Sequence, residues 1–131
     1  MRTCCLTALL GVAVWGCGST GGSPVAPTGA AISIVNYTYV PQRLVVTPGT
    51  TVNILNEDPF QHSVTSSSAP GVFAFGSVNG ISFDTGPFTG NRAIAIPATA
   101  MPGTVVPYFC TLHPGNMVDQ GEIAIVAPSS N

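Results

Sequence analysis

The chain has 131 residues, enough for one domain with short extensions, and its composition gives no sign of two cores. Only 6% of the residues are charged, whereas glycine (15) and proline (12) are abundant. This composition disfavours amphipathic helices with charged faces and favours short strands joined by turns. The formal net charge is -2, and the sequence contains no basic patch that could neutralise phosphates, so nucleic acid is not an expected partner.

The first 16 residues have the features of a lipoprotein signal peptide. Arg2 precedes an apolar run from Leu6 to Val14, which is shorter than the roughly 20 residues that a membrane-spanning helix needs. The run ends in Val14-Trp15-Gly16-Cys17. This motif resembles the lipobox of bacterial lipoproteins, in which the residue matching Cys17 is lipid-modified and becomes the new N-terminus. An ordinary secretory signal or an uncleaved anchor is the alternative, and in each case we expect the domain outside the cytoplasm.

Residues 17–30 form a Gly/Ser/Pro-rich stretch, which predicts a flexible tether between the lipid and the domain. The domain itself is predicted to span residues 31–127, followed by a short tail at 128–131. A lipid at Cys17 would anchor this domain to a bacterial membrane, facing the periplasm or the cell exterior.

Short strand patterns separated by Gly/Pro turns recur along the domain. They cover residues 31–39, 43–47, 51–56, 91–97, 105–110 and 121–126, with a short continuation at 64–65. The pattern is weaker over 72–84, where we expect Phe73, Phe75 and Phe83 to contribute to the core. Pro107 interrupts one strand and is expected at a sheet edge or a bulge. An all-β domain of seven to eight strands, a sandwich or a barrel, is therefore predicted.

The cysteines leave one thiol in the folded domain. Cys4 and Cys5 would be removed with the signal and Cys17 would carry lipid, so Cys110 has no disulfide partner. An unpaired thiol outside the cytoplasm is a liability unless it is buried, reactive or bound to metal. Cys110 alone does not distinguish an inert buried cysteine from a metal ligand.

Two further side chains that bind metals follow Cys110 in one short stretch, Tyr-Phe-Cys-Thr-Leu-His-Pro-Gly-Asn-Met, which contains His113 and Met117. Thiolate, imidazole and thioether are the ligand types that suit copper in both of its common oxidation states. A type I copper site needs a second imidazole, and the remaining histidine of the chain is His62. We therefore expect folding to bring His62 to this loop.

Other metals fit this set of ligands less well. Zinc rarely binds thioether, which makes one cysteine, two histidines and a methionine a poor zinc set. A dinuclear copper centre would need two thiolates in the loop, where Cys110 stands alone. Each residue taken singly also has an ordinary structural interpretation, because a lone methionine is usually core filler.

On these residues the chain resembles the cupredoxins, the small blue copper proteins that include plastocyanin, pseudoazurin and amicyanin. The resemblance covers about residues 31 to 126 and includes the segments 41–46, 48–52, 56–64, 83–86, 102–104, 108–117 and 121–126. It implies a Greek-key β-sandwich that binds one copper ion and shuttles single electrons. It also implies that His62, Cys110 and His113 are equatorial ligands and that Met117 is the axial ligand.

The same resemblance implies how the site would meet its partners. The histidine matching His113 exposes one ring edge through an apolar patch, here with Pro114, Phe60 and Leu112, and this edge is the electron exit and docking surface. Ser63 stands where plastocyanins and amicyanins often have Asn, so the hydrogen bond that braces the cysteine loop is expected to be weaker or rerouted. Thr111 is expected to contribute to it.

The leading functional prediction is therefore an extracytoplasmic, monomeric electron carrier that meets its redox partner proteins transiently. The alternative is a copper-binding or copper-delivery lipoprotein that does not cycle between oxidation states. A catalytic oxidase or reductase would need further histidines for a second copper centre. With both histidines engaged by metal, no Ser/His/Asp arrangement is possible, so we expect no catalytic residues and no enzyme.

Overall fold

The computed structural model describes residues 29–114, 117 and 121–130. Within these residues the chain forms eight strands and no helix, and accordingly no helix here meets the length and apolarity that a membrane span requires. The strands are β1 (Ala31–Val35), β2 (Thr38–Val40), β3 (Arg43–Val46), β4 (Thr51–Asn56), β5 (Thr65–Ser66), β6 (Gly90–Ala95), β7 (Val105–Phe109) and β8 (Gly121–Ile125). The predicted all-β class is confirmed.

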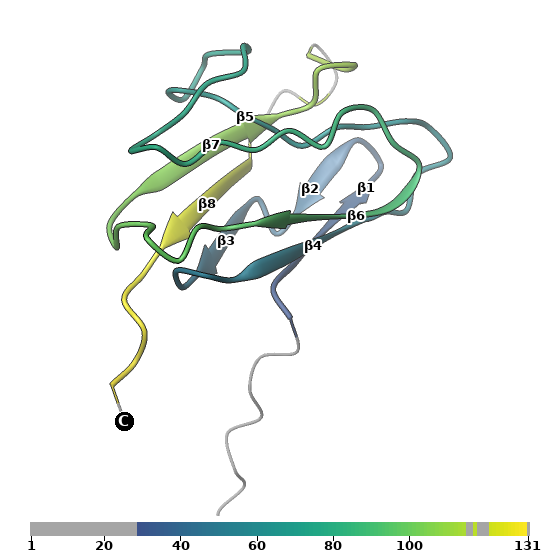
Figure 1. Ribbon diagram of the computed structural model, residues 1–131. Helices are drawn as coiled ribbons and strands as arrows, with labels where there is room; N and C mark the ends of the chain where they lie inside the picture. The colour runs from purple at the N-terminus through teal and green to yellow at the C-terminus, as the bar shows by residue number, and fades with distance from the viewer. Residues whose placement is uncertain (1–28, 115–116, 118–120, 131) are drawn as a thin grey trace, which may run out of the picture.

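Two four-stranded mixed sheets form the domain, with strand orders β2-β1-β4-β6 and β3-β8-β7-β5 (Figure 1). β1 pairs in parallel with β4, and β3 pairs in parallel with β8, whereas the remaining neighbours are antiparallel. One continuous core cluster includes Ile32 and Ile54 of the first sheet and Val106 and Ile123 of the second. The two sheets therefore pack through their apolar faces as a sandwich.

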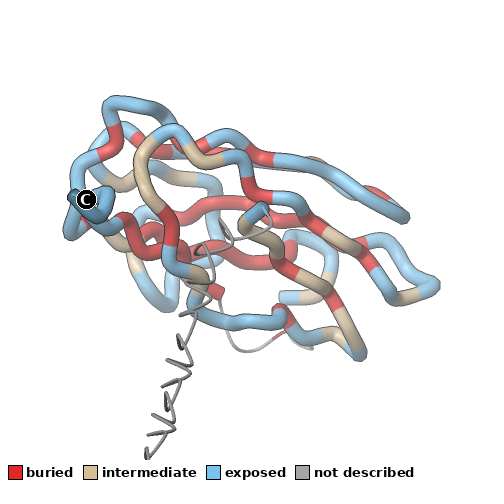
Figure 2. The backbone as a smooth tube through the Cα atoms, turned by 90° about the horizontal axis from the view of Figure 1, so that it is seen from below, coloured by how far each residue is buried: buried red, intermediate tan, exposed pale blue. Residues whose placement is uncertain are grey.

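The alternation of residues along the strands explains this packing. In β4 the side chains of Val52 and Ile54 are fully buried, whereas Thr51 and Asn53 between them are exposed. Successive side chains of a strand point to opposite faces, so one face of the strand is apolar. Buried segments accordingly lie in the middle of the molecule and exposed segments form its outer loops (Figure 2).

The run from 31 to 39 forms a hairpin, and the prediction of a single strand is wrong. Val35 pairs with Thr38, which leaves a two-residue turn. Asn36 and Tyr37 both have positive φ angles, 50° and 59°, as a type I′ turn requires. A tyrosine seldom adopts this conformation, so a turn at this position was not predictable from the local residues.

Two of the three phenylalanines expected in the core lie on the surface instead. Phe83 is 7% exposed and belongs to the core, but Phe73 is 45% and Phe75 is 63% exposed. Phe73 packs edge-on against Phe109, with ring centroids 5.9 Å apart, and so covers the outer face of β7. These rings line a loop outside the sandwich because no strand forms between β5 and β6 to carry them inward.

The prediction that Pro107 lies at a sheet edge or a bulge is wrong. Pro107 belongs to β7, an interior strand whose register with β8 is continuous. It pairs with Glu122 of β8 and is buried. Its carbonyl accepts a hydrogen bond from the Ser67 N–H, on the β5 side of β7. Because the N and C=O of one residue face the same side of a strand, the missing N–H also faces that side, beyond the end of two-residue β5. The β7–β8 ladder therefore loses no hydrogen bond.

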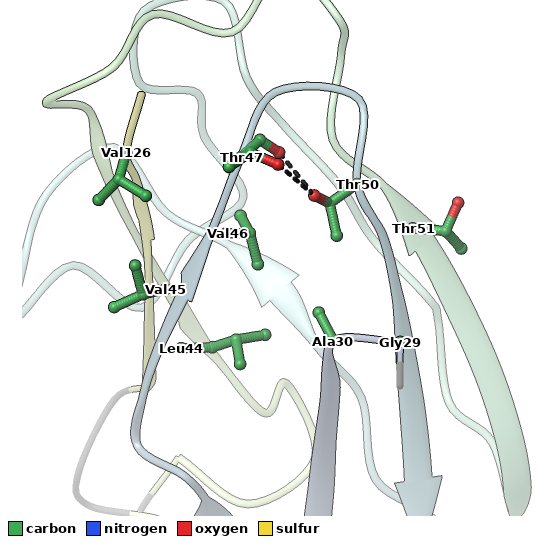
Figure 3. Close-up of a pocket in the computed structure, with 9 residues that line it drawn as sticks. All are labelled: Gly29, Ala30, Leu44, Val45, Val46, Thr47, Thr50, Thr51 and Val126. Carbon is green, nitrogen blue, oxygen red and sulfur yellow. Dashed lines mark hydrogen bonds between the residues drawn. The ribbon is translucent and has the colours of Figure 1, made fainter. Parts of the chain in front are cut away.

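An apolar surface pocket lies beside β3 (Figure 3). It is lined by Gly29, Ala30, Leu44, Val45, Val46, Thr47, Thr50, Thr51 and Val126. None of the expected metal ligands or docking residues contributes to it, so this pocket is separate from the predicted site.

Two buried tyrosines in the core differ in their hydroxyl groups. Tyr39 and Tyr108 pack edge-to-face with ring centroids 4.8 Å apart. Burial raises the pKa of both phenols far above the usual value, so both are neutral. The Tyr39 hydroxyl donates to the Ser63 carbonyl at 2.7 Å, whereas the Tyr108 hydroxyl has no partner among the described residues.

We predict that Tyr39→Phe lowers the free energy of unfolding of the metal-free protein by about 1–3 kcal/mol, because a buried carbonyl loses its donor. The matched variant Tyr108→Phe should not lower the free energy of unfolding, since the Tyr108 hydroxyl makes no hydrogen bond among the described residues. Urea unfolding of both variants measures the difference. Equal destabilisation by the two substitutions would contradict the assigned bond.

Candidate metal centre

His62 lies in the segment that connects β4 to β5 and is fully buried. Its backbone exchanges two hydrogen bonds with Phe88, at 3.1 and 2.9 Å. The side-chain amide of Asn56, at the end of β4, donates to the carbonyls of Phe60 and Phe88 at 2.8 and 3.0 Å. These bonds fix the path of the segment, so the position of the His62 ring is set by the scaffold.

Cys110 and His113 follow β7 directly, at the end of the molecule away from the C-terminus (Figure 1). The Cys110 thiol is fully buried, whereas His113 is half-buried. The N–H of Met117 donates to the His113 carbonyl at 3.0 Å. This bond connects Met117 to the backbone of His113.

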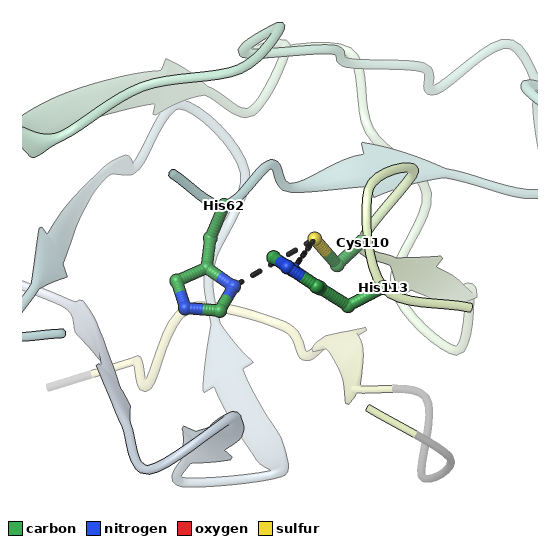
Figure 4. A group of neighbouring side chains, drawn as sticks. All are labelled: His62, Cys110 and His113. Carbon is green, nitrogen blue, oxygen red and sulfur yellow. Dashed lines mark hydrogen bonds between the residues drawn. The ribbon is translucent and has the colours of Figure 1, made fainter. Parts of the chain in front are cut away.

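The structure brings His62, Cys110 and His113 together, as the sequence predicted (Figure 4). The ligand atoms of the three side chains lie within 4.8 Å of one another. Cys110 Sγ lies 3.8 Å from His62 Nδ1 and 3.6 Å from His113 Nδ1. Both imidazoles therefore turn the same type of nitrogen toward one sulfur.

Ser63 and Thr111, expected to brace the cysteine loop, join the two segments that carry the ligands. The Ser63 N–H donates to Cys110 Sγ at 3.3 Å. The Ser63 hydroxyl accepts a hydrogen bond from the Thr111 N–H at 2.9 Å and lies 3.0 Å from the Thr111 hydroxyl. The serine side chain thus connects to the cysteine loop directly.

Asp58 contacts the opposite side of the His62 ring, with 2.9 Å between Oδ2 and Nε2. A proton on Nε2 leaves Nδ1 free as a ligand. Burial lowers the pKa of His62 and so favours the neutral ring. The Asp58 carboxylate acts in the opposite direction but does not outweigh burial. Burial alone would raise the pKa of Asp58, but hydrogen bonds from Tyr37, Asn36 and His62 outweigh it, and its pKa lies below the usual value.

Tyr37 covers both histidines. Its ring lies edge-on to His62 and to His113, with centroids 5.2 and 5.0 Å away and interplanar angles of 84° and 89°. Phe60 lies next to Tyr37, at 5.7 Å between centroids, and is 52% exposed. An aromatic rim therefore borders the ligand cluster.

The remaining predicted site residues have different positions. Met117 is 3% exposed and belongs to the core cluster, and its role as axial ligand stays a prediction. Leu112 is 42% exposed and Pro114 is exposed, so both lie on the surface beside half-buried His113. Cys17 lies outside the described residues.

The ligand atoms suit one copper ion. Two neutral imidazole nitrogens and one thiolate form the strong ligands of a type I copper site. Zinc in structural sites takes four closely bound ligands, but the described residues supply only three of its usual kind within reach of one another. The cluster His62, Cys110 and His113 therefore fits a type I site, with copper supplying one-electron chemistry when bound.

Comparison with solved structures agrees with this geometry, although no protein-family model and no curated protein match the chain. A purple cupredoxin from Nitrosopumilus maritimus matches with 27% identity and a TM-score of 0.53, over 73% of this chain and 98% of that one. The chain has the cupredoxin fold. A mutant of amicyanin in its reduced Cu(I) form matches with 19% identity and a TM-score of 0.54, over 78% of this chain and 86% of amicyanin.

A copper-containing nitrite reductase from Thermus scotoductus matches with 22% identity and a TM-score of 0.57. The match covers 85% of this chain but 25% of the reductase. The chain thus spans about a quarter of that enzyme, whereas it spans most of the purple cupredoxin and of amicyanin.

Sequence reasoning missed two residues of the centre, Asp58 and Tyr37. A carboxylate four positions before a candidate ligand histidine is a usable signal, because ligand histidines often donate their second N–H to a carboxylate. Tyr37 gave no comparable signal, since its position depends on a hairpin turn that the sequence pattern did not show.

We predict that the metal-free protein loses stability as the pH falls below about 6.5, the ordinary pKa of histidine. Because burial lowers the pKa of His62 in the folded state, the unfolded chain binds this proton first. The contribution of neutral His62 to the free energy of unfolding is fully present above about pH 6.5 and is lost as the pH falls toward the lower pKa of His62 in the folded state. Urea midpoints between about pH 7.5 and pH 5 measure this slope.

His62→Gln should flatten the slope, because the titrating group is gone. Asp58 becomes protonated only at more acidic pH, since its pKa is lowered. Its titration therefore does not contribute to the difference in slope between the two proteins. Identical slopes for the wild type and His62→Gln would contradict the prediction.

Proposed function

We propose that this cupredoxin is an extracytoplasmic single-electron carrier that holds one copper ion through His62, Cys110 and His113, with Met117 as the axial ligand. The observation that carries the proposal is the prearranged set of ligand atoms, with two imidazole nitrogens 3.8 and 3.6 Å from one fully buried sulfur. Ligands held by the scaffold need to move little between oxidation states, which favours fast electron transfer.

The chain's own residues would prepare the ligands. Cys110 must lose its proton to bind as thiolate, which the charge of the metal assists. The Ser63 N–H then donates a hydrogen bond to the sulfur, as it already does in the structure. Burial of Cys110 keeps water from the sulfur, so the thiolate faces copper in a dry environment.

Electrons would leave through half-buried His113, and partners would dock on the apolar surface around it. Phe60 and Leu112 are 52% and 42% exposed, and Pro114 is exposed as well. No charged side chain belongs to this set, so association should depend weakly on salt. Docking of this kind buries little area and is short-lived, as electron transfer requires.

The location and the lack of catalysis belong to the same proposal. The lipobox-like motif at Cys17 and the Gly/Ser/Pro stretch after it support a lipid-anchored domain outside the cytoplasm. The relatives that this chain covers almost completely are small cupredoxins, and its match to the nitrite reductase covers 25% of that enzyme. This supports an electron carrier over an enzyme.

Colour tests the proposal. Adding Cu(II) to the purified domain should give an intense thiolate-to-copper absorption band that bleaches on reduction and returns on oxidation. Cys110→Ser should abolish the band, because the thiolate produces it. Met117→Leu should keep the band but shift the reduction potential, and the control Met101→Leu, at a residue 59% exposed, should change neither.

Two outcomes would contradict the proposal. A band that survives Cys110→Ser would remove the assigned ligand. A protein that takes up Cu(I) but cannot be re-oxidised reversibly would indicate copper delivery without redox cycling.

The docking surface is tested by electron self-exchange between oxidised and reduced protein, measured by NMR line broadening. Leu112→Lys should slow self-exchange about tenfold or more at low salt, because two like charges then meet at the contact. Added salt should restore part of the rate by screening. Wild-type self-exchange should vary little with salt.

Val45→Lys is the matched control, because it adds the same charge at a residue 53% exposed on β3. Val45 is level with the start of β7, whereas Cys110 follows its end. An equal slowing by both variants would show that self-exchange does not use the surface around His113.

A further inference from the structure

We propose that Asp58 is a positioning residue of the metal centre, which sets the orientation and basicity of His62 and holds Tyr37 against both histidines. The inference rests on the proposed copper site and adds to it a layer outside the ligands. It assigns to Asp58 a preference of the site for Cu(II) over Cu(I).

Asp58 is placed so that both carboxylate oxygens are used inside the protein. The side chain is 7% exposed. Oδ1 accepts a hydrogen bond from the Asn36 N–H at 2.7 Å. Oδ2 accepts one from the Tyr37 N–H at 2.9 Å and contacts His62 Nε2 at 2.9 Å. Two backbone N–H groups of a turn distant in sequence and the ring of nearby His62 thus converge on one carboxylate.

The Asn36–Tyr37 turn depends on this carboxylate. Both residues have positive φ, which costs free energy for a side chain as large as tyrosine. Within the turn their N–H groups point at Asp58 from 22 and 21 residues away in sequence. Hydrogen bonds to a charged acceptor are stronger than those to a neutral one, so these two bonds offset that cost.

The Asn36–Tyr37 turn also places the Tyr37 ring against the two histidines. The ring stands edge-on to His62 and His113, and the two imidazole centroids are 4.9 Å apart. Tyr37 therefore limits the tilt of both imidazoles and shields the space beside them. Asp58 acts on His62 directly and on His113 through Tyr37.

The charge of Asp58 acts on the metal through the His62 ring. A carboxylate that accepts the Nε2–H makes Nδ1 a stronger electron donor. Cu(II) carries more charge than Cu(I) and gains more from such a donor. No arginine among the described residues forms an ion pair with Asp58, because the one arginine ion pair there joins Arg43 to Glu122. The charge of Asp58 is therefore not cancelled by an arginine. Asp58 therefore lowers the reduction potential.

The test compares Asp58→Asn with Glu57→Gln, because Glu57 is an exposed carboxylate on the same loop. Both substitutions remove one negative charge, but only the first removes it from a side chain that contacts His62. We expect Asp58→Asn to weaken Cu(II) binding about 10- to 100-fold, as measured by ligand competition. Cu(I) binding should weaken less. A tenfold difference between the two losses corresponds to a rise of about 59 mV in potential.

A measurement on metal-free protein tests the same inference without copper. Nitrogen chemical shifts of the His62 ring should show a proton on Nε2 in the wild type and in Glu57→Gln. In Asp58→Asn we expect this tautomer to lose its dominance, because the amide offers one acceptor for three donors. The wild-type measurement stands even where Asp58→Asn does not fold.

The outcomes separate this inference from the proposed function. A wild-type His62 protonated on Nδ1 would overturn it, as would equal loss of Cu(I) and Cu(II) affinity in Asp58→Asn, which indicates a merely structural role. An equal effect of Glu57→Gln would also overturn it. A wild type with no thiolate-to-copper band would instead overturn the proposed function, and with it the effect on copper.

Discussion

Ser63 joins the two segments that carry the ligands, and the metal centre depends on that junction. It follows His62 directly and uses all of its polar groups. Its N–H donates to the Cys110 sulfur and its hydroxyl accepts from the Thr111 N–H, while its carbonyl accepts from the Tyr39 hydroxyl in the core. These bonds hold the thiol and the first imidazole in register before any metal binds. The scaffold therefore sets the ligand geometry, and reduction or oxidation changes it little.

Charged side chains are few near the centre, and among the described residues Asp58 is the carboxylate that contacts a ligand histidine. Only 6% of the chain is charged, and the docking surface around His113 contains no ionisable side chain besides His113 itself. The Asp58 side chain is 7% exposed and its Oδ2 lies 2.9 Å from His62 Nε2, so its charge acts strongly on the His62 ring. The same scarcity leaves the outer surface apolar. Low charge thus serves both the electronics of the site and transient docking.

The ligands could be predicted from the sequence because Cys110 and His113 are three residues apart at the end of a clear strand, and His62 is the remaining histidine. Strands with regular alternation, such as β4 and β8, were predictable for the same local reason. The turn at Tyr37 was not, because a carboxylate 21 residues away holds it. The prediction that Phe73 lies in the core was wrong for a related reason, since apolar character alone does not distinguish the inner from the outer face of a sheet.

The two histidines divide the work of an electron carrier. His62 is fully buried and its Nε2 contacts Asp58. In the proposed carrier this contact adjusts the preference of the site for Cu(II) or Cu(I). His113 is half-buried beside exposed Leu112 and Phe60, and in the proposed carrier it is the histidine that meets the partner. A change in the docking surface therefore leaves the Asp58 contact intact, and a change at Asp58 leaves the apolar surface in place. Tyr37 touches both rings, so a change at Tyr37 is expected to affect both roles.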